Sequence, residues 1–253
     1  MGAAAWLGAL SPSAASTETQ ADGAAVREYE LVAQERRWEL LPGEGFDAYT
    51  FNGQVPGPVL RAQEGELLRV TFRNDLPEAT SIHWHGVDVP NAMDGVPGLT
   101  QAAIAPGETV VYEFPAKPAG TRFYHTHGNG LPFSEADQLD RGLYGPLLIE
   151  PAVPPDPAAA ARQRARQPDK DFVLMLDEWR GGAHGAHGAG DYSIFTFNGK
   201  GDPLSDRLVV RRGDRVRLRL INAGTSAFHP IHLHGHQVKV VATDGHPGRG
   251  GFE

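Results

Sequence analysis

The sequence predicts an all-β protein made of two β-sandwich domains, of which the second is incomplete. Short segments alternate between apolar and polar residues, as half-buried strands do, and no long segment has helical periodicity. The chain contains 31 Gly and 20 Pro, and short strands separated by such residues favour sandwiches or barrels. A series of motifs also occurs twice, which indicates that one domain was duplicated.

The predicted strands are of two kinds. Residues 68–73 and 216–220 alternate clearly between the two faces of a sheet. The other candidates are short β-branched or aromatic runs bounded by Gly or Pro, and they comprise residues 109–114, 122–125, 146–150 and 172–176. The Gly-rich segment 245–251 does not resemble a strand.

The duplication sets the predicted domain boundaries. Phe51-Asn52-Gly53 recurs at 197–199, Gly65-Glu66 recurs as Gly213-Asp214, and the motif at 82–86 recurs at 231–235, each about 146 to 149 residues later. We therefore expect one domain over 26–150, a second over 169–253, and a linker over 151–168 that is rich in Pro, Ala, Arg and Gln. The counterpart of the first domain's last strands would fall beyond residue 253, so we expect the second domain to lack them.

Composition narrows the possible partners. The formal net charge of −8 makes a nucleic-acid partner unexpected on electrostatic grounds. The 253 residues contain no Cys, which excludes disulfides and thiolate metal ligands within them.

Residues 1–25 resemble a secretory signal without its basic start, with a disordered tail as the alternative, so we expect export to the periplasm or the exterior. No run of 18 apolar residues follows, and no membrane span is expected.

Histidines are the most informative residues of the chain. Eight of its 11 His lie in three short clusters. The residues of a strand alternate between its faces, so each His-x-His pair presents two imidazoles to one side. Neutral imidazole binds copper, zinc, iron and nickel, and three such clusters predict a metal site. The clusters consist of His83 and His85; His125 and His127; and His229, His232, His234 and His236.

The clusters resemble three of the four copper motifs of the multicopper oxidases. The flanking segments 51–58, 91–98, 141–146 and 222–226 agree, and the resemblance covers about residues 45–245. The third motif stands in the second domain, which is similar to the two-domain, laccase-like branch of that family. The resemblance implies two cupredoxin-like Greek-key β-sandwiches with copper as the cofactor.

The resemblance also implies a role for each motif residue. His83 and His232 match ligands of the type 2 copper, and His229 matches a ligand of the type 1 copper. Asp94 resembles an acidic residue that assists proton delivery at the oxygen site, with a turn residue before Gly95 as an equal alternative. The ligands of the type 3 copper pair are matched by His85, His125, His127 and His234, whereas His236 matches no ligand.

By this resemblance the protein is an oxidase that couples one-electron oxidation of phenols or metal ions to the reduction of O₂ to water. The oxygen site takes ligands from both domains, which in two-domain relatives meet between the subunits of a homotrimer. The fourth motif, His-Cys-His, does not occur in the sequence, and a blue type 1 site needs its cysteine. We therefore expect these 253 residues to bind copper but not to catalyse this oxidation by themselves.

Three alternatives remain open at this point. One is a copper-binding or copper-tolerance protein without catalysis. Another is a copper nitrite reductase, although Thr126 stands between two His where that family places a Cys beside its type 1 ligands. The third is a zinc hydrolase, which needs fewer His than this chain supplies. His184 and His187, in the Gly-rich segment 181–190, belong either to a mobile loop or to a weak copper-collecting loop, and the reducing substrate stays open.

Overall fold

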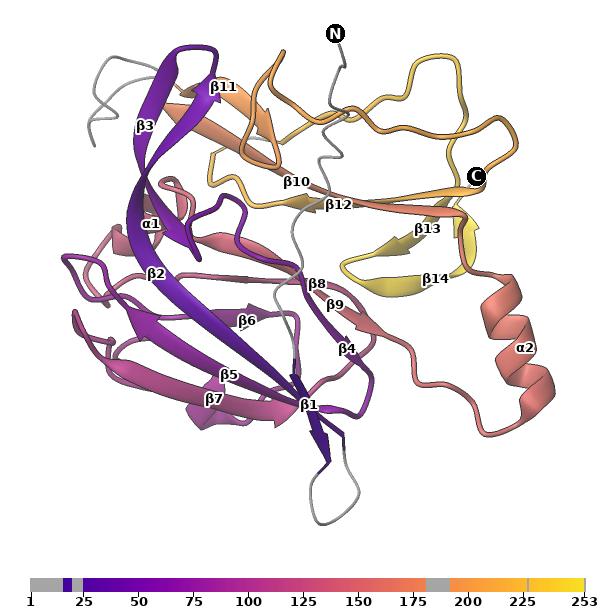
Figure 1. Cartoon of the computed structure of the whole chain (residues 1–253), viewed down its shortest axis with the longest axis horizontal. Helices are drawn as coiled ribbons and strands as arrows, with labels where there is room; N and C mark the ends of the chain where they lie inside the picture. Colours follow the sequence, from indigo (N-terminus) through magenta and orange to yellow (C-terminus); the bar gives the residue numbers. More distant parts are fainter. Residues whose placement is uncertain (1–15, 20–24, 181–191, 227, 253) are drawn as a thin grey trace, which may run out of the picture.

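A computed structural model describes residues 16–19, 25–180, 192–226 and 228–252, and these are mostly β-structure arranged in four sheets (Figure 1). The all-β prediction is confirmed. No helix in the described part of the chain is both long and apolar enough to span a membrane. Of the predicted signal-like segment 1–25, the structure describes only residues 16–19 and 25.

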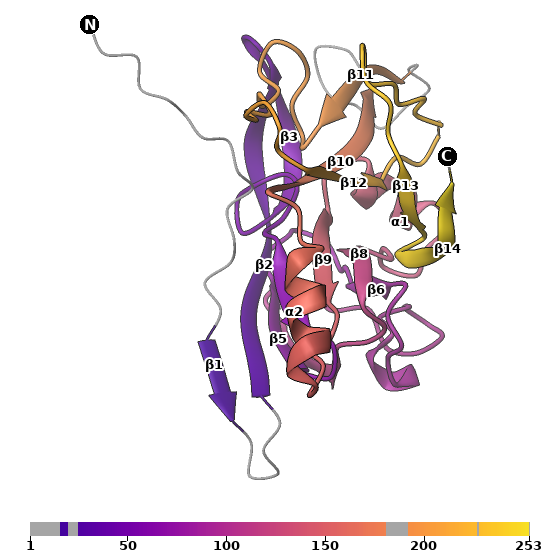
Figure 2. The ribbon, with the colours of Figure 1, turned by 90° about the vertical axis from the view of Figure 1, so that its right-hand side faces the viewer.

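The first half of the chain is a sandwich of two sheets. One sheet has the order β1-β2-β5-β7, with β3 also paired to β2, and the other has the order β4-β9-β8-β6. The strands of the first sheet are β1 (Ser16–Thr19), β2 (Ala25–Leu41), β3 (Glu44–Phe51), β5 (Leu67–Asn74) and β7 (Thr109–Pro115). Those of the second are β4 (Leu60–Gln63), β6 (His83–His85), β8 (Gly120–His125) and β9 (Tyr144–Glu150). The two sheets lie face to face in Figure 2.

The core between these sheets determines how β6 presents its side chains. Trp84 is fully buried and packs against Phe114 at 4.9 Å and Tyr112 at 5.5 Å between ring centroids. Because neighbours along a strand point to opposite faces, burial of Trp84 turns His83 and His85 away from the core. Trp84 thus orients the first histidine pair.

The second half has a smaller sheet of order β11-β10-β12 and a separate hairpin of β13 and β14. Its strands are β10 (Lys170–Arg180), β11 (Tyr192–Phe197), β12 (Val216–Asn222), β13 (Val240–Thr243) and β14 (His246–Phe252). A second core cluster joins this sheet to the first half, since Met175 and Trp179 of β10 pack with Tyr144 of β9 and with Phe46 of β3. The predicted domain boundaries remain a prediction.

The structure repeats in its second half the local geometry of the first. β2 pairs parallel to β5 and antiparallel to β3, and β10 pairs parallel to β12 and antiparallel to β11. Asn52 and Asn198 both have positive φ, 55° and 51°. Each Asn accepts a backbone N–H and donates to a carbonyl of the neighbouring long strand, at 2.6 and 2.8 Å for Asn52 and at 2.8 and 3.1 Å for Asn198. These matching contacts support the duplication.

Two segments contain secondary structure that the sequence pattern did not predict. The predicted linker contains a helix, α2 (Pro157–Ala165), which Asp156 caps by accepting from the N–H groups of Ala158 and Ala159. The segment 245–251, expected not to form a strand, lies almost entirely in β14. The reason is the turn Asp244-Gly245, where φ is 48° and 70°, values that suit a tight hairpin.

The third histidine cluster also differs, because residues 229–236 belong to no strand. In the first half, β6 is a strand because it pairs with β8. No described segment pairs with residues 231–235, so the backbone there has no partner to hold it extended. The face alternation assumed for this cluster therefore does not apply to the structure.

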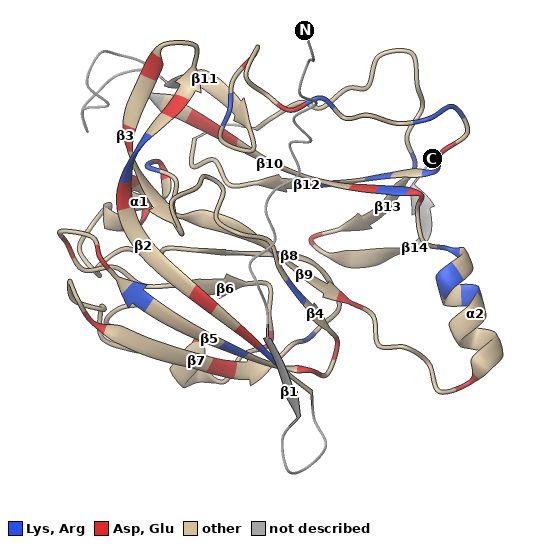
Figure 3. Ribbon diagram, in the orientation of Figure 1, with Lys and Arg blue, Asp and Glu red and all other residues tan. Residues whose placement is uncertain are grey.

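Hydrogen bonds and ion pairs connect the second half of the chain to the first. Arg219 of β12 donates to Thr121 of β8 at 3.0 Å, to Glu150 of β9 at 2.9 Å and to Asp171 of β10 at 2.8 Å. Arg122 of β8 donates to the carbonyl of Asp244 in the β13–β14 turn at 2.8 Å. Acidic and basic residues are otherwise interspersed along the strands (Figure 3). Two further short helices, η1 (Asn91–Met93) and α1 (Ser134–Leu139), lie next to the histidines described below.

Candidate metal centre

Three histidines from two adjacent strands converge at one point. His83 and His125 are paired directly across the β6–β8 ladder, and His85 is paired with Phe123. One ring nitrogen from each of His83, His85 and His125 lies within 4.8 Å of the others. We refer to these three residues as the histidine cluster. It arises because the two strands bring a His-x-His pair and the first His of the next motif to the same face.

His127 lies just beyond the end of β8 and beside the cluster. Its ring centroid is 5.4 Å from that of His83 and 6.0 Å from that of His125. Its backbone N–H donates to Ser81 Oγ at 3.1 Å, which fixes the main chain where β8 ends. All four histidines predicted in the first domain therefore lie together.

Hydrogen bonds place a proton on Nδ1 of two of these rings, so Nε2 carries the lone pair when either ring is neutral. His83 Nδ1 donates to the carbonyl oxygen of Asp94 at 2.8 Å, and His125 Nδ1 donates to that of Thr126 at 2.7 Å. A carbonyl oxygen only accepts, so the proton must be on Nδ1 in both rings. His85 Nδ1 faces His125 Nε2 at 3.4 Å. Metal-binding histidines generally have their second nitrogen held in this way.

Burial favours the uncharged form of two of the three cluster histidines, His85 and His125. His125 is buried, and this burial, together with the neighbouring His83, lowers its pKa to about 3. Burial and His83 also lower the pKa of His85 below its ordinary value. His85 stacks on Phe123 with ring centroids 4.4 Å apart. Neutral imidazole is the form that binds metal, so the lowered pKa values of His85 and His125 favour the form that a ligand needs.

Asp94 approaches His83 through two groups. Besides its carbonyl contact, its Oδ1 atom lies 3.4 Å from His83 Nδ1. The close approach depends on Gly95, where φ is +80° and an added Cβ would lie 1.7 Å from the carbonyl oxygen of Ile82. The structure thus places Asp94 beside a cluster histidine, and its role in proton delivery stays a prediction.

The histidines of the third motif lie elsewhere. His229 Nε2 contacts Glu178 Oε2 at 2.7 Å, and Glu178 also accepts from the backbone N–H of Ser226 at 2.6 Å. His232 and His234 have ring centroids 4.8 Å apart and are exposed. Among the described residues, neither of them joins the first-half histidine cluster. His184 and His187 lie outside the described residues.

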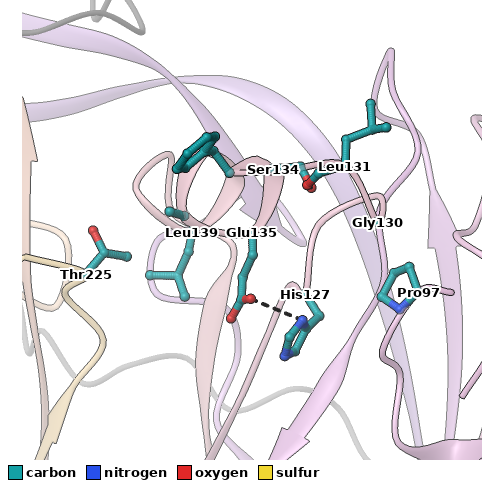
Figure 4. Close-up of a pocket in the computed structure, with 10 residues that line it drawn as sticks. Pro97, His127, Gly130, Leu131, Ser134, Glu135, Leu139 and Thr225 are labelled. Atoms are coloured by element: carbon teal, nitrogen blue, oxygen red, sulfur yellow. Dashed lines mark hydrogen bonds and ion pairs between the residues drawn. The ribbon is translucent and has the colours of Figure 1, made fainter. Parts of the chain in front are cut away.

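A pocket opens beside His127, with a volume of about 380 Å³. Figure 4 shows His127 pointing toward Glu135 on one wall, with Pro97 and Leu131 on another and Thr225 of the second half opposite. His127 Nδ1 lies 3.1 Å from Glu135 Oε2. The pocket therefore gives solvent access to His127, beside the histidine cluster.

The donor set fits copper. Four imidazoles lie together and at least two present Nε2, while nitrogen ligands of this kind suit copper and zinc better than magnesium or calcium. Zinc sites generally use four ligands, or three and a water, so four imidazoles would suit zinc as well.

Sequence reasoning did not identify Glu135 and Glu178, the carboxylate partners of His127 and His229. Neither carboxylate stands in a recognisable motif, so only the folded chain could reveal them.

A mostly β fold with clustered imidazoles defines a class of metal-binding β-sandwich protein, and comparison with known proteins identifies its family. The multicopper oxidase models match residues 33–153 and 170–249. The structure of a blue copper oxidase from Nitrosomonas europaea is 35% identical with a TM-score of 0.76, over 90% of this chain and 70% of that one. The chain therefore belongs to the multicopper oxidase family, whose members are oxidoreductases that bind copper and use O₂.

Curated relatives agree with this family. A copper resistance protein A homolog of Pseudomonas syringae is 30% identical over 89% of this chain, and Laccase-2 of Botryotinia fuckeliana is 36% identical over 86%. The chain spans only 44% and 39% of the lengths of these two relatives. These matches therefore show the family of the chain but not the activity of the whole protein.

Proposed function

We propose that this chain contributes the oxygen-reducing copper centre of a laccase-like oxidase. Its substrates would be phenols or metal ions, oxidised one electron at a time, with O₂ reduced to water. The observation that supports this most strongly is the convergence of His83, His85 and His125, with His127 beside them. Bound copper would supply the electron transfer between reducing substrate and O₂, and the protein's own groups would hold and orient the metal.

The residues around the cluster have distinct tasks in this proposal. The carbonyl oxygens of Asp94 and Thr126 accept hydrogen bonds from Nδ1 of His83 and His125, so Nε2 would be the atom of each ring that binds copper. Trp84 and Phe123 fix the positions of the rings through packing. The carboxylate of Asp94, one third exposed and 3.4 Å from His83 Nδ1, would pass protons between solvent and the site.

A second copy of the chain would complete the centre. The family resemblance assigns His232 and His234 to the same oxygen site, but these residues lie apart from the cluster within one chain. We propose that they face the cluster of a neighbouring copy in a homotrimer. Export to the periplasm or exterior is proposed as well, on the composition of residues 1–25.

Copper titration of single variants tests the proposal. His83→Ala and His232→Ala should each lower the number of copper ions bound per chain, measured by elemental analysis after dialysis. His236→Ala is the matched control, because it removes an imidazole from the same motif without a predicted ligand role. If neither of the first two variants changes the copper stoichiometry, the ligand assignment is wrong.

The second candidate is a copper-binding or copper-tolerance protein without turnover. Two observations favour it: the 253 residues contain no Cys for a type 1 site, and one relative is named as a copper resistance protein homolog. Oxygen uptake with a phenol separates the two candidates when the chain is extended by a family-type C-terminal segment that carries the His-Cys-His motif. Sustained uptake by the extended, copper-loaded chain would support the oxidase, whereas copper binding without uptake would favour this alternative.

A further inference from the structure

Glu135 is the acidic residue that contacts His127, and neither the sequence motifs nor the family comparison draws attention to it. Its Oε2 atom lies 3.1 Å from His127 Nδ1 (Figure 4). The shortest Nδ1 contacts of His83 and His125 are with uncharged carbonyl oxygens, and the Asp94 carboxylate lies farther from His83 Nδ1, at 3.4 Å. His127 is therefore the ring of these three whose Nδ1 contact is with a carboxylate alone.

The fold holds Glu135 in this position through a second residue of α1. Gln138, in the same helix, is buried and its Oε1 accepts from Thr126 Oγ1 and from Thr80 Oγ1, both at 2.7 Å. Thr126 directly precedes His127 in the chain. The helix that carries Glu135 is therefore bonded to the residue next to His127, which fixes the distance between the two side chains.

The start of the helix is also packed closely against the chain that follows His127. Gly128 has φ +70°, and a Cβ there would lie 2.3 Å from Ser134 Oγ and 2.6 Å from the backbone nitrogen of Glu135. Only glycine permits this approach. Ser134 Oγ in turn accepts from the N–H of Asn129 at 3.2 Å and donates to the carbonyl of Leu131 at 2.7 Å, so the connecting loop has a defined shape.

We propose that Glu135 is a positioning residue for His127, and this inference rests on the proposed copper site. The carboxylate accepts the Nδ1 proton, so that His127 presents Nε2 toward the cluster. A hydrogen-bonded carboxylate also makes an imidazole a stronger electron donor to a metal. Because Glu135 lines the pocket and is 43% exposed, its replacement need not disturb the core.

A double-mutant cycle with copper(II) as the probe tests this role. In the 253-residue chain, Glu135→Ala should weaken the apparent copper affinity about tenfold. Glu135→Gln, which keeps an acceptor oxygen but no charge, should weaken it less. Both variants should change the copper(II) electron paramagnetic resonance spectrum. In a His127→Ala background, neither change should weaken binding further, because the residue through which Glu135 acts is gone.

The controls separate this role from general effects. Glu30→Gln removes an exposed negative charge from β2, in the other sheet of the sandwich, and should leave copper affinity unchanged. Far-ultraviolet circular dichroism checks folding, and the isosteric Glu135→Gln decides if Glu135→Ala fails to fold. Affinities within twofold of the parent, or a loss of equal size in the His127→Ala background, would overturn the inference. A parent chain that binds no copper would refute the proposed function and this inference together.

Discussion

Gly95→Ala is expected to weaken copper binding, although Gly95 is not itself a predicted ligand. Gly95 has φ +80°, and an added Cβ would lie 1.7 Å from the carbonyl oxygen of Ile82 and 3.1 Å from the nitrogen of His83. No side chain fits at such distances, so the loop that carries Asp94 must move away from β6. That movement breaks the hydrogen bond of 2.8 Å from His83 Nδ1 to the Asp94 carbonyl.

Gly98→Ala is the matched control for this change. Gly98 lies in the same loop with φ +78°, and nothing lies within 4 Å of an added Cβ. Both variants bear the cost of a left-handed conformation, about 1–2 kcal/mol. Only Gly95→Ala adds the steric contact and the lost hydrogen bond, which is worth about 0.5–1.5 kcal/mol. We expect a free energy of unfolding lower by about 2–4 kcal/mol for Gly95→Ala and by about 1–2 kcal/mol for Gly98→Ala.

Urea denaturation of the metal-free chain measures the stability difference, and copper titration measures the effect on the site. Loss of the partner that orients a ligand typically costs about 10–100-fold in metal affinity, so Gly95→Ala should bind copper at least about tenfold more weakly than Gly98→Ala. Equal stability and equal copper affinity of the two variants would refute the reasoning. It would mean that the position of Asp94 does not control His83.

Three further predictions concern the interface, the pH dependence and the spectrum. Arg219→Met should destabilise the chain by about 3 kcal/mol, because it leaves the carboxylates of Glu150 and Asp171 without their buried partner. Arg217→Met, at a more exposed ion pair, should cost under about 1 kcal/mol. Urea denaturation compares the free energies of unfolding of the two variants. His125 has a pKa of about 3 in the folded chain against 6.5 ordinarily, so below pH 6.5 the unfolded chain gains a proton that the folded chain does not. Stability of the metal-free chain should therefore fall by up to about 1.4 kcal/mol per pH unit between pH 6.5 and 3 from this group, and urea denaturation at pH 7.5 and 5.0 should show a smaller drop for His125→Leu. The copper-loaded chain should lack the intense blue absorption of a copper–thiolate bond, since the sequence has no Cys; visible spectroscopy checks this, and a strong blue band would contradict it.

Much of the first half of the fold could be predicted from local patterns. The alternation in 68–73 corresponds to β5, and the β-branched run 109–114 corresponds to β7. The prediction was wrong for 245–251, where the Asp244-Gly245 turn forms a hairpin that the glycine content obscured. It also missed α2, although Asp156-Pro157 is a typical helix start.

The candidate site was predictable only in part. Spacing alone shows that His83 and His85 share a face, since this follows from the geometry of one strand. It gives no distance between His83 and His125, which meet because β6 pairs with β8 in a particular register. For the third cluster the same spacing was misleading, because a strand needs a partner and residues 231–235 have none in the described part of the chain.

The sequence by itself determined the β-rich class, the duplication and the imidazole-rich chemistry of the chain, because each depends on residue type and short spacing. The tertiary structure alone decided which histidines meet, that Nδ1 of His83 and His125 is protonated, and that Glu135 and Glu178 face His127 and His229. These contacts join residues that lie 8 to 51 positions apart in the chain, except for that of His125 with Thr126. Contacts across such separations follow from the packing of whole strands and helices, and no local pattern encodes that packing.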